Sequence, residues 1–323
     1  MRRRDFIILL GGTAVACPPA SRAFAQQAKT YRIGILSILS RPSESIFRDA
    51  MRDLGYVEGR NVVYETRYAG RADRLAETAA ELVRAKPDVI VTAGGPASVA
   101  AKAATATIPI VLWGAGDPVG TGLVVNISHP GGNITGVTEL STELTAKRLQ
   151  LFKDLVPRLK RVAVIWNVED LAMSLRFQEA EVVAPRLGLS IMPLPVHDIV
   201  DFDAVFTALK RDPPDGVFVV SDRITAQREP ALIELLRLQR IPSAFEFPPS
   251  ARAGGLISYG PSIEELAPRA AAFVDRILKG AKPGDLPLEA PVRWHLIVNR
   301  RTAIAIGVEI PASILARADE VIE

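Results

Sequence analysis

Two glycines and a proline interrupt the chain between an apolar run and an alanine-rich stretch in the segment VTAGGPASVAAKAAT, residues 91–105. Gly94 and Gly95 have no Cβ atom, so another group can come close to this backbone. The alanine-rich stretch predicts a helix, and the first N–H groups of a helix have no internal partner and attract anions. Together with the Ser98 hydroxyl, the glycines predict a binding site for a small anionic group. A tight turn between strand and helix is the alternative reason for the glycines, and capping of the helix start is the alternative role of Ser98.

Polar residues also follow the other apolar runs that we expect to form strands. In parallel α/β sheets, ligands bind beyond the carboxyl ends of the strands. A few convergent polar groups between apolar walls are typical of a site for a small solute. The predicted binding residues are Ser37, Gly94, Gly95, Ser98, Asp117, Thr138, Asn167, Asp222, Glu246 and Tyr259. Glu139, next to Thr138, also falls at such a strand end.

Aromatic residues near the same strand ends offer apolar walls for a solute. The candidates are Trp113, Trp166, Phe245 and Tyr259. For the two tryptophans, a place in the core at the sheet edge is the alternative. For Asp117, which precedes Pro118, shaping a turn is the alternative to ligand binding.

The sequence carries no recognisable catalytic or metal-binding pattern. His129, His197 and His295 lie far apart and lack the spacing of metal ligands. No nucleophile elbow and no phosphate-binding loop of the G-x-x-x-x-G-K type occurs. The segment 114–120 is similar to a dinucleotide-binding fingerprint, but its third glycine comes one position too late. We therefore expect no metal, no cofactor and no enzymatic activity.

Short apolar runs alternate with helical patterns along most of the chain. Strands are predicted at 32–37, 62–68, 88–93, 109–113, 134–138, 161–166, 190–194, 216–221, 242–247, 256–259 and 293–298. Helices are predicted at 44–54, 71–85, 97–104, 142–155, 172–187, 202–210, 230–239 and 263–278. This order predicts an α/β fold with parallel sheets covered by helices on both faces.

The length of this pattern predicts two lobes. Each half spans about 110–120 residues, and together they exceed what one doubly wound sheet needs. We expect residues 29–138, with about 260–283, to form lobe 1 and residues 139–259 to form lobe 2, joined by hinge strands at 134–138 and 256–260. Residues 280–291, rich in proline and glycine, predict a surface crossing. The C-terminal segment 284–323 is not assigned to either lobe.

Residues 1–25 have the layout of an export signal. A basic start at Arg2, Arg3 and Arg4 precedes an apolar stretch at 6–16 and the sequence Ala-Phe-Ala at 23–25, which fits a cleavage site. The adjacent arginines indicate the twin-arginine route, with ordinary secretion as the alternative. Cys17, the only cysteine, leaves lipid anchoring as a further alternative. We expect a periplasmic protein that begins near Gln26.

The net charge gives no reason to expect a nucleic-acid partner. The chain has 39 basic and 36 acidic residues, and loss of residues 1–25 removes four arginines and one aspartate, leaving 35 of each. A formally neutral mature protein lacks the excess of basic residues that binds phosphates. Loss of Cys17 also excludes a disulfide or a thiolate nucleophile.

Several longer segments carry a resemblance to a known family. They are RRRDFIILLGG, LGYVEGRNV, AAKAATATIPIVLWGAGDPVGTGLV, HPGGNITGVTELSTELTAKRL, GGLISYGPS, RILKGAKPGDLP and LARADEVIE. Over nearly its whole length the chain resembles substrate-binding proteins of ABC transporters related to the tryptophan/tyrosine-type binding protein. The resemblance implies a type I periplasmic-binding fold, in which two α/β lobes close on a small solute.

The resemblance also implies the ligand and the partner. Amino acids, especially aromatic ones, are the implied solutes, and residues 94–98 would then hold the carboxylate. An ABC transporter permease in the inner membrane is the implied partner, and we expect a monomer. Two other functions stay open, an exported subunit that senses a ligand and an enzyme on the same two-lobed fold.

Overall fold

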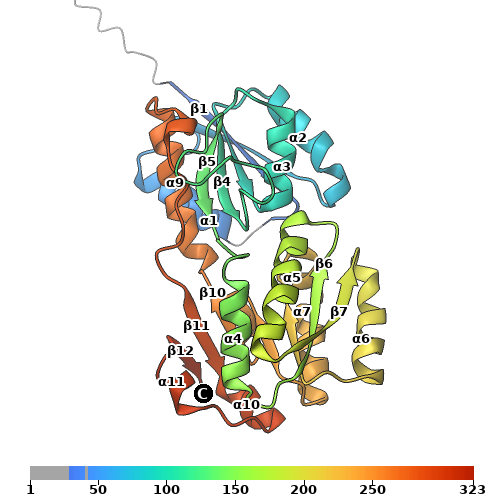
Figure 1. Ribbon diagram of the computed structural model, residues 1–323. Helices are drawn as coiled ribbons and strands as arrows, with labels where there is room; N and C mark the ends of the chain where they lie inside the picture. The colour runs from blue at the N-terminus through green and yellow to red at the C-terminus, as the bar shows by residue number, and fades with distance from the viewer. Residues whose placement is uncertain (1–28, 41–42) are drawn as a thin grey trace, which may run out of the picture.

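The computed structural model describes residues 29–40 and 43–323 and contains two α/β lobes stacked one on the other (Figure 1). Each lobe is built on its own mainly parallel sheet. The export signal predicted at 1–25, including Cys17, lies outside the described residues. The prediction of two parallel-sheet lobes of the type I periplasmic-binding kind is confirmed.

The first lobe has a five-stranded sheet in the order β2-β1-β3-β4-β5, with every neighbouring pair parallel. The strands are β1 (Tyr31–Ser37), β2 (Val62–Tyr68), β3 (Val89–Ala93), β4 (Ile110–Ala115) and β5 (Ile134–Thr138). The helices are α1 (Ser43–Asp53), α2 (Leu75–Arg84), α3 (Gly95–Ala104) and α9 (Ile263–Leu278). Side chains of α1 and α9 share one core cluster and those of α2 and α3 another, so helices cover both faces of the sheet.

The second lobe has a seven-stranded sheet in the order β12-β11-β10-β9-β8-β6-β7. Its strands are β6 (Arg161–Asn167), β7 (Ser190–Val196), β8 (Gly216–Val219), β9 (Ser243–Phe245), β10 (Ile257–Gly260), β11 (His295–Asn299) and β12 (Glu320–Ile322). Its helices are α4 (Thr145–Leu155), α5 (Leu171–Val183), α6 (Phe202–Arg211), α7 (Arg223–Leu238), α8 (Pro248–Arg252), α10 (Arg300–Ile306) and α11 (Ala312–Leu315). Helices α4 and α5 pack on one face, and α6 and α7 pack on the other.

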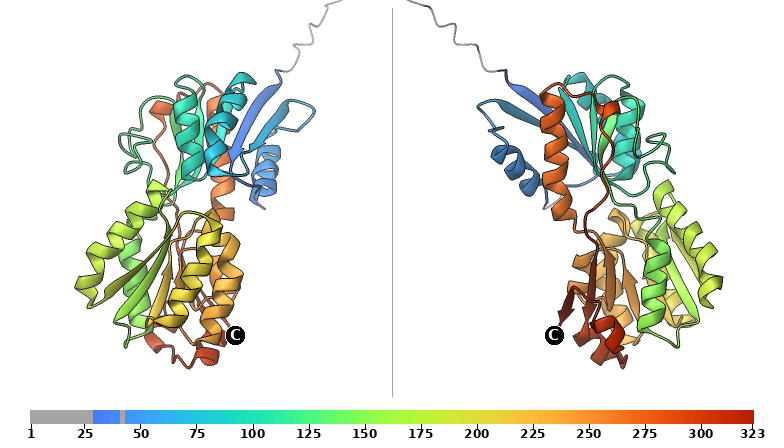
Figure 2. Two further views of the ribbon diagram at one scale, coloured as in Figure 1. Left: turned by 90° about the vertical axis from the view of Figure 1, so that its right-hand side faces the viewer. Right: turned by 60° about the vertical axis from the view of Figure 1, so that its left-hand side comes forward.

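The chain passes between the lobes three times, at residues 139–144, 261–262 and 279–294 (Figure 2). The last crossing first runs beside β5, where the Glu289 N–H donates to Gly136 O at 2.9 Å and the Thr138 N–H donates to Glu289 O at 2.9 Å. It then enters the second lobe at the edge where β10 ends. Strand β11 therefore starts at that edge and pairs antiparallel to β10, which is the one reversed pair among the described strands of this sheet.

Helix α7 differs most from the expected elements, because it begins at Arg223 rather than at residue 230. The Asp222 carboxylate accepts hydrogen bonds from the N–H groups of Ile224 and Thr225 at 2.9 and 2.8 Å, which fixes an early start. Pro230 is then inside the helix, although proline usually favours the first turn. This early start places residues 223–229 along the edge of the sheet that faces the first lobe.

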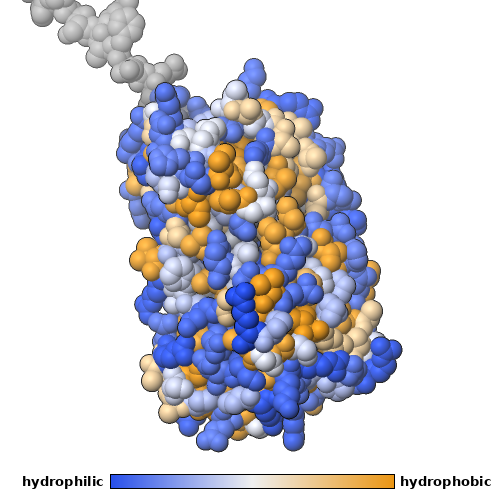
Figure 3. Space-filling model, in the orientation of Figure 1, coloured by the Kyte–Doolittle hydropathy of each residue, from blue (hydrophilic) through white to orange (hydrophobic). Residues whose placement is uncertain are grey.

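The exterior of both lobes mixes polar and apolar side chains on the face seen in Figure 3. Within residues 29–40 and 43–323, no helix combines the length and the apolar character that crossing a membrane requires.

Candidate functional site

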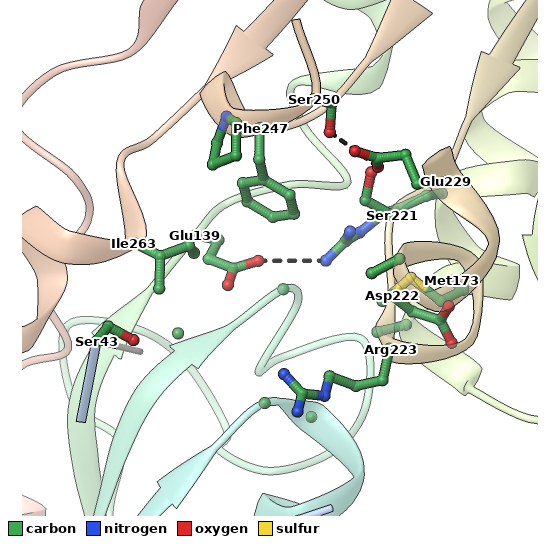
Figure 4. Close-up of a pocket in the computed structure, with 18 of the residues that line it drawn as sticks. Ser43, Glu139, Met173, Ser221, Asp222, Arg223, Glu229, Phe247, Ser250 and Ile263 are labelled. Atoms are coloured by element: carbon green, nitrogen blue, oxygen red, sulfur yellow. Dashed lines mark hydrogen bonds and ion pairs between the residues drawn. The ribbon is translucent and has the colours of Figure 1, made fainter. Parts of the chain in front are cut away.

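A cavity of about 370 Å³ lies between the lobes and takes its walls from both of them (Figure 4). Because parallel strands of both sheets end here, the helices that follow them start here. The lining residues are Ser43, Gly94, Gly95, Gly114, Gly116, Glu139, Ala172, Met173, Arg176, Ser221, Asp222, Arg223, Ala226, Glu229, Phe247, Pro249, Ser250, Ile263 and Glu264.

The first lobe presents glycine backbone to this cavity. Gly94 has a φ of +96°, which favours glycine, and it is the residue before α3. Gly95 has no such constraint, and a Cβ added to it would lie 4.0 Å from the nearest side-chain atom, Asp170 Oδ1 of the second lobe. The backbone at Gly94 requires glycine for its conformation, whereas Gly95 keeps space open in the cavity.

The start of α3 differs from the other long helix starts around the cavity. Helices α5 and α7 are capped by Asp170 and Asp222, and α1 and α9 carry glutamates in their first turns. Among the described helices of ten or more residues whose first turns line the cavity, α3 alone has neither a side-chain cap nor an acidic first turn. Its first N–H groups, at Gly95 and Ala97, have no acceptor within the helix. The positive end of this helix therefore faces the cavity without a cap or an acidic residue of its own, and the nearest carboxylate is Asp170 of the second lobe.

A buried network of four charged side chains closes the cavity at the hinge. Arg148 Nη1 lies 2.7 Å from Glu246 Oε1, and Arg176 Nη1 lies 2.7 Å from Glu246 Oε2. Arg176 Nη2 also lies 3.5 Å from Glu139 Oε2, at the start of the first crossing. The side chains of Arg148, Arg176 and Glu246 are at most 1% exposed. Two cations and two anions make the network formally neutral, which burial requires.

The pKa values of the two arginines respond differently to this burial. Burial lowers the pKa of Arg148 below its ordinary value, and the nearby charge of Glu246 only partly opposes the change. Burial also acts to lower the pKa of Arg176, but the carboxylates of Glu246 and Glu139 outweigh it and raise the pKa. Arg176 contacts both Glu246 of the second lobe and Glu139 of the first crossing, and so joins the second lobe to the hinge.

Two glycines at the end of β4 allow this network to form. A Cβ atom on Gly116 would overlap the guanidinium of Arg176, and one on Gly114 would lie 2.7 Å from Glu139 Oε1. Gly116 belongs to the first lobe and Arg176 to the second, so the side chain of one lobe fits against bare backbone of the other. A further contact, from Arg223 Nη2 to Ser40 O at 3.2 Å, also joins the lobes.

The second lobe provides an apolar wall with polar groups beyond it. Phe247 and Met173 line the cavity, and Glu229 and Ser250 lie on the second-lobe side (Figure 4). Burial raises the pKa of Glu229 above its ordinary value, although a hydrogen bond from Ser250 partly opposes the change. The Ser221 hydroxyl is buried without a hydrogen-bond partner among the described residues.

Three of the ten predicted binding residues line the cavity: Gly94, Gly95 and Asp222. Asp222 uses Oδ1 to cap α7, and its Oδ2 accepts a hydrogen bond from Asn167 Nδ2 at 2.6 Å. Asn167 thus lies behind Asp222 and does not line the cavity.

The hydroxyls of three other predicted residues bond to the protein itself. Ser98 is fully buried, and its Oγ donates to Gly94 O at 2.8 Å and lies 2.8 Å from Thr92 Oγ1. Thr138 Oγ1 donates to Ala115 O at 2.9 Å, and Ser37 Oγ donates to Leu39 O at 2.8 Å. These groups hold strand ends and the start of α3 rather than facing the cavity.

The remaining predicted residues also lie outside the cavity lining. Asp117 accepts a hydrogen bond from the Gly120 N–H at 2.7 Å, which is the turn-forming role considered as its alternative. Tyr259 accepts a bond from Arg148 Nε at its carbonyl oxygen. Glu246 is fully buried between two arginines, and this placement does not support its predicted contact with a ligand.

The aromatic wall also differs from the expected one. Trp113 stacks on Phe47 with ring centroids 5.5 Å apart, and Trp166 stacks on Phe177 at 3.6 Å. Both tryptophans are core residues, and neither Phe245 nor Tyr259 lines the cavity. The wall comes instead from Phe247.

Sequence reasoning missed Arg176, Glu229 and Phe247. Arg176 lies on the buried face of α5, which is otherwise formed by Ala172, Met173, Phe177 and Ala180. A charged residue at a position where the helical pattern predicts burial could have identified it. Glu229 was not recognised as a site residue because the predicted helix began after it, at residue 230. Among the described residues, no group of three or more histidine, cysteine, aspartate or glutamate side chains is arranged to hold a metal ion.

Comparison with known proteins agrees with this architecture. Residues 32–322 match the family described as ABC transporter substrate binding protein. The tyrosine-binding protein of Clostridioides difficile (strain R20291) is 26% identical over 287 residues, which are 87% of this chain and 82% of that protein.

Two solved structures are similar over most of this chain. A conserved domain protein from Vibrio cholerae has a TM-score of 0.85 at 26% identity, covering 91% of this chain and 100% of that one. An ABC domain from Streptococcus pneumoniae in complex with L-Trp has a TM-score of 0.83 at 24% identity, with the same coverage. At 24% identity, the similarity to the Streptococcus pneumoniae structure supports a shared fold only. With a family match over almost the whole described chain, the resemblance seen in the sequence is confirmed, and the chain belongs to the family of ABC transporter substrate-binding proteins.

Proposed function

We propose that this protein binds an amino-acid-like solute between its lobes and delivers it to an ABC transporter permease. The observation that carries the proposal is the uncapped start of α3, which faces acidic side chains across the cavity. A volume of about 370 Å³ lies at the small end of the range for ligand pockets. A small zwitterion suits a cavity that is positive at one side and acidic at the other.

The solute carboxylate is placed at the N–H groups of Gly95 and Ala97 in this proposal. Its ammonium group then faces Asp222 or Glu139, because both carboxylates line the cavity and an ammonium needs charged or carbonyl acceptors. Phe247 and Met173 leave an apolar wall for the solute side chain. The names of the tyrosine-binding relative and of the L-Trp complex support an aromatic amino acid.

The cellular location, the permease partner and the monomeric state are part of the same proposal. The basic, apolar and small-residue segments of residues 1–25 support export to the periplasm. Family membership supports an ABC permease of the inner membrane as the partner. We propose that a monomer carries the solute, since one chain supplies both lobes and the whole cavity.

A thermal-shift screen tests the proposed solute class. Mature protein is heated with each of the 20 L-amino acids and with neutral sugars as controls, because a ligand that binds the folded state raises the melting temperature. We expect one or more aromatic amino acids to raise it and the sugars to leave it unchanged. A rise with sugars and none with any amino acid would contradict the proposal.

Replacing Gly95 with valine tests the carboxylate site. The backbone at Gly95 accepts a side chain without a close contact, so the fold should tolerate valine while the added methyl groups occupy the space above the first N–H groups. We expect at least a tenfold loss of affinity for the solute found in the screen, measured by isothermal titration calorimetry.

The matched control for this variant is Ala103→Val, at an exposed position on the same helix. It introduces the same side chain into α3 away from the cavity, so affinity should stay within twofold of wild type. If Gly95→Val lowers the melting temperature strongly but leaves the affinity of the folded fraction unchanged, Gly95 serves the turn and not the ligand.

A further inference from the structure

Glu229 and Ser250 form a polar pair at the second-lobe side of the cavity. Glu229 lies in the second turn of α7 and Ser250 lies on the short helix α8, and both line the cavity. Ser250 Oγ donates a hydrogen bond to Glu229 Oε2 at 2.9 Å. The pair comes from two elements that the fold brings together.

The carboxylate of Glu229 keeps acceptor capacity that the described protein does not use. Ser250 is its one hydrogen-bond donor among residues 29–40 and 43–323, and no arginine, lysine or histidine in this range forms an ion pair with it. Glu229 is partly exposed to the cavity, and a carboxylate that loses this water when a solute binds needs donors in its place, since an unpaired buried acceptor costs free energy. An N–H or O–H group of a bound solute would supply the missing donor.

A second unpaired polar group faces the same cavity. Ser221 lines it and is 9% exposed, and its Oγ has no hydrogen-bond partner among the described residues. The Phe247 ring lies between Glu139 and Ser250 in Figure 4. In the same view Ser250 and Glu229 lie on the side of this ring away from Glu139, so an apolar solute side chain that runs along Phe247 would point toward Glu229.

We propose that Glu229, held by Ser250, selects solutes with a hydrogen-bond donor at the far end of an aromatic side chain, an indole N–H or a phenol O–H. The inference rests on the proposed function and makes the solute class narrower. A site built to accept a hydrogen bond rejects an analogue that lacks the donor, because its own polar group is then left unpaired. Phenylalanine is such an analogue of tyrosine, differing by one hydroxyl group.

Calorimetric titration of the mature protein with L-Trp, L-Tyr and L-Phe tests this selectivity. Wild type should bind L-Tyr or L-Trp at least tenfold more tightly than L-Phe. Glu229→Met keeps the length of the side chain and removes the acceptor, so it should lower affinity for the preferred amino acid at least tenfold and change that for L-Phe less than threefold. Ser250→Ala should act in the same direction by a smaller factor.

Glu234→Gln is the matched control, because Glu234 is exposed on the same helix and pairs with Arg237. It should leave all three affinities unchanged. Equal affinity of wild type for the three amino acids would overturn the selectivity while leaving the proposed function in place. Binding of none of the three would overturn both. If Glu229→Met does not fold, Glu229→Leu replaces it, and an equal loss for all three amino acids would overturn the proposal.

Discussion

Replacing Glu246 with glutamine should lower the free energy of unfolding of the ligand-free protein by about 3–5 kcal/mol, the cost of leaving buried charges without their partner. Glu246 accepts from both arginines at 2.7 Å, and its Oε2 also accepts the Ser221 N–H at 2.8 Å. Without its charge, Arg148 has no ion-pair partner among the described residues. Glu139 remains 3.5 Å from Arg176 and balances the charge of only one of the two arginines.

Urea denaturation followed by circular dichroism measures this loss. Glu234→Gln is again the control, since an exposed ion pair contributes little and its removal should change the free energy of unfolding by less than about 0.5 kcal/mol. A loss below about 1 kcal/mol for Glu246→Gln would show that water or rearrangement compensates the two arginines, and that the buried network contributes little to stability.

Replacing Gly116 with alanine should weaken solute binding about 100-fold, which corresponds to roughly 2.7 kcal/mol. The new Cβ would overlap the Arg176 guanidinium, which Glu246 and Glu139 hold in place. Gly116 and Arg176 belong to different lobes, so we expect hinge opening to separate them and the variant to penalise selectively the arrangement in which the lobes meet. The melting temperature of the ligand-free protein should therefore change far less than affinity.

A double-mutant cycle isolates this contact. In an Arg176→Met background, Gly116→Ala should have little further effect on affinity, because the overlapping group is gone. Small-angle scattering adds an independent reading, since Gly116→Ala should keep the larger radius of gyration of an open protein at solute concentrations that compact wild type. If the two substitutions are additive, the overlap between Gly116 and Arg176 does not limit closure.

Most of the fold was predictable because its signals are local. Strands β2 and β5 and helix α9 occupy the predicted residues, since apolar runs and helical periodicity report burial directly. The start of α7 was missed because Pro230 resembles a helix start, while the cap that decides the matter depends on the backbone around Asp222. The antiparallel direction of β11 follows from a chain crossing, which no local pattern encodes.

Site residues were predictable from the sequence only where the backbone itself requires a particular residue type. Gly94 and Gly95 stand out because two glycines between a strand and a helix mark backbone that needs either a positive φ or space for another group. Glu246 follows a strand as Asp222 does, but its surroundings come from Arg148 and Arg176, which are 98 and 70 residues away in sequence. Pairing over such distances depends on the packing of α4 and α5 against the sheet, so the type and position of Glu246 alone did not distinguish a ligand contact from a buried ion pair.

In the proposed binding mode, the interlobe cavity holds an amino acid with its carboxylate at the start of α3. A crystal structure of the mature protein grown with the aromatic amino acid that gives the largest thermal shift tests it most directly. We predict carboxylate oxygens within hydrogen-bond distance of the Gly95 and Ala97 N–H groups, and an ammonium group on the side of Asp222 and Glu139. A carboxylate bound to Arg223 with the start of α3 unoccupied, or an amino acid bound outside the cavity, would contradict the account.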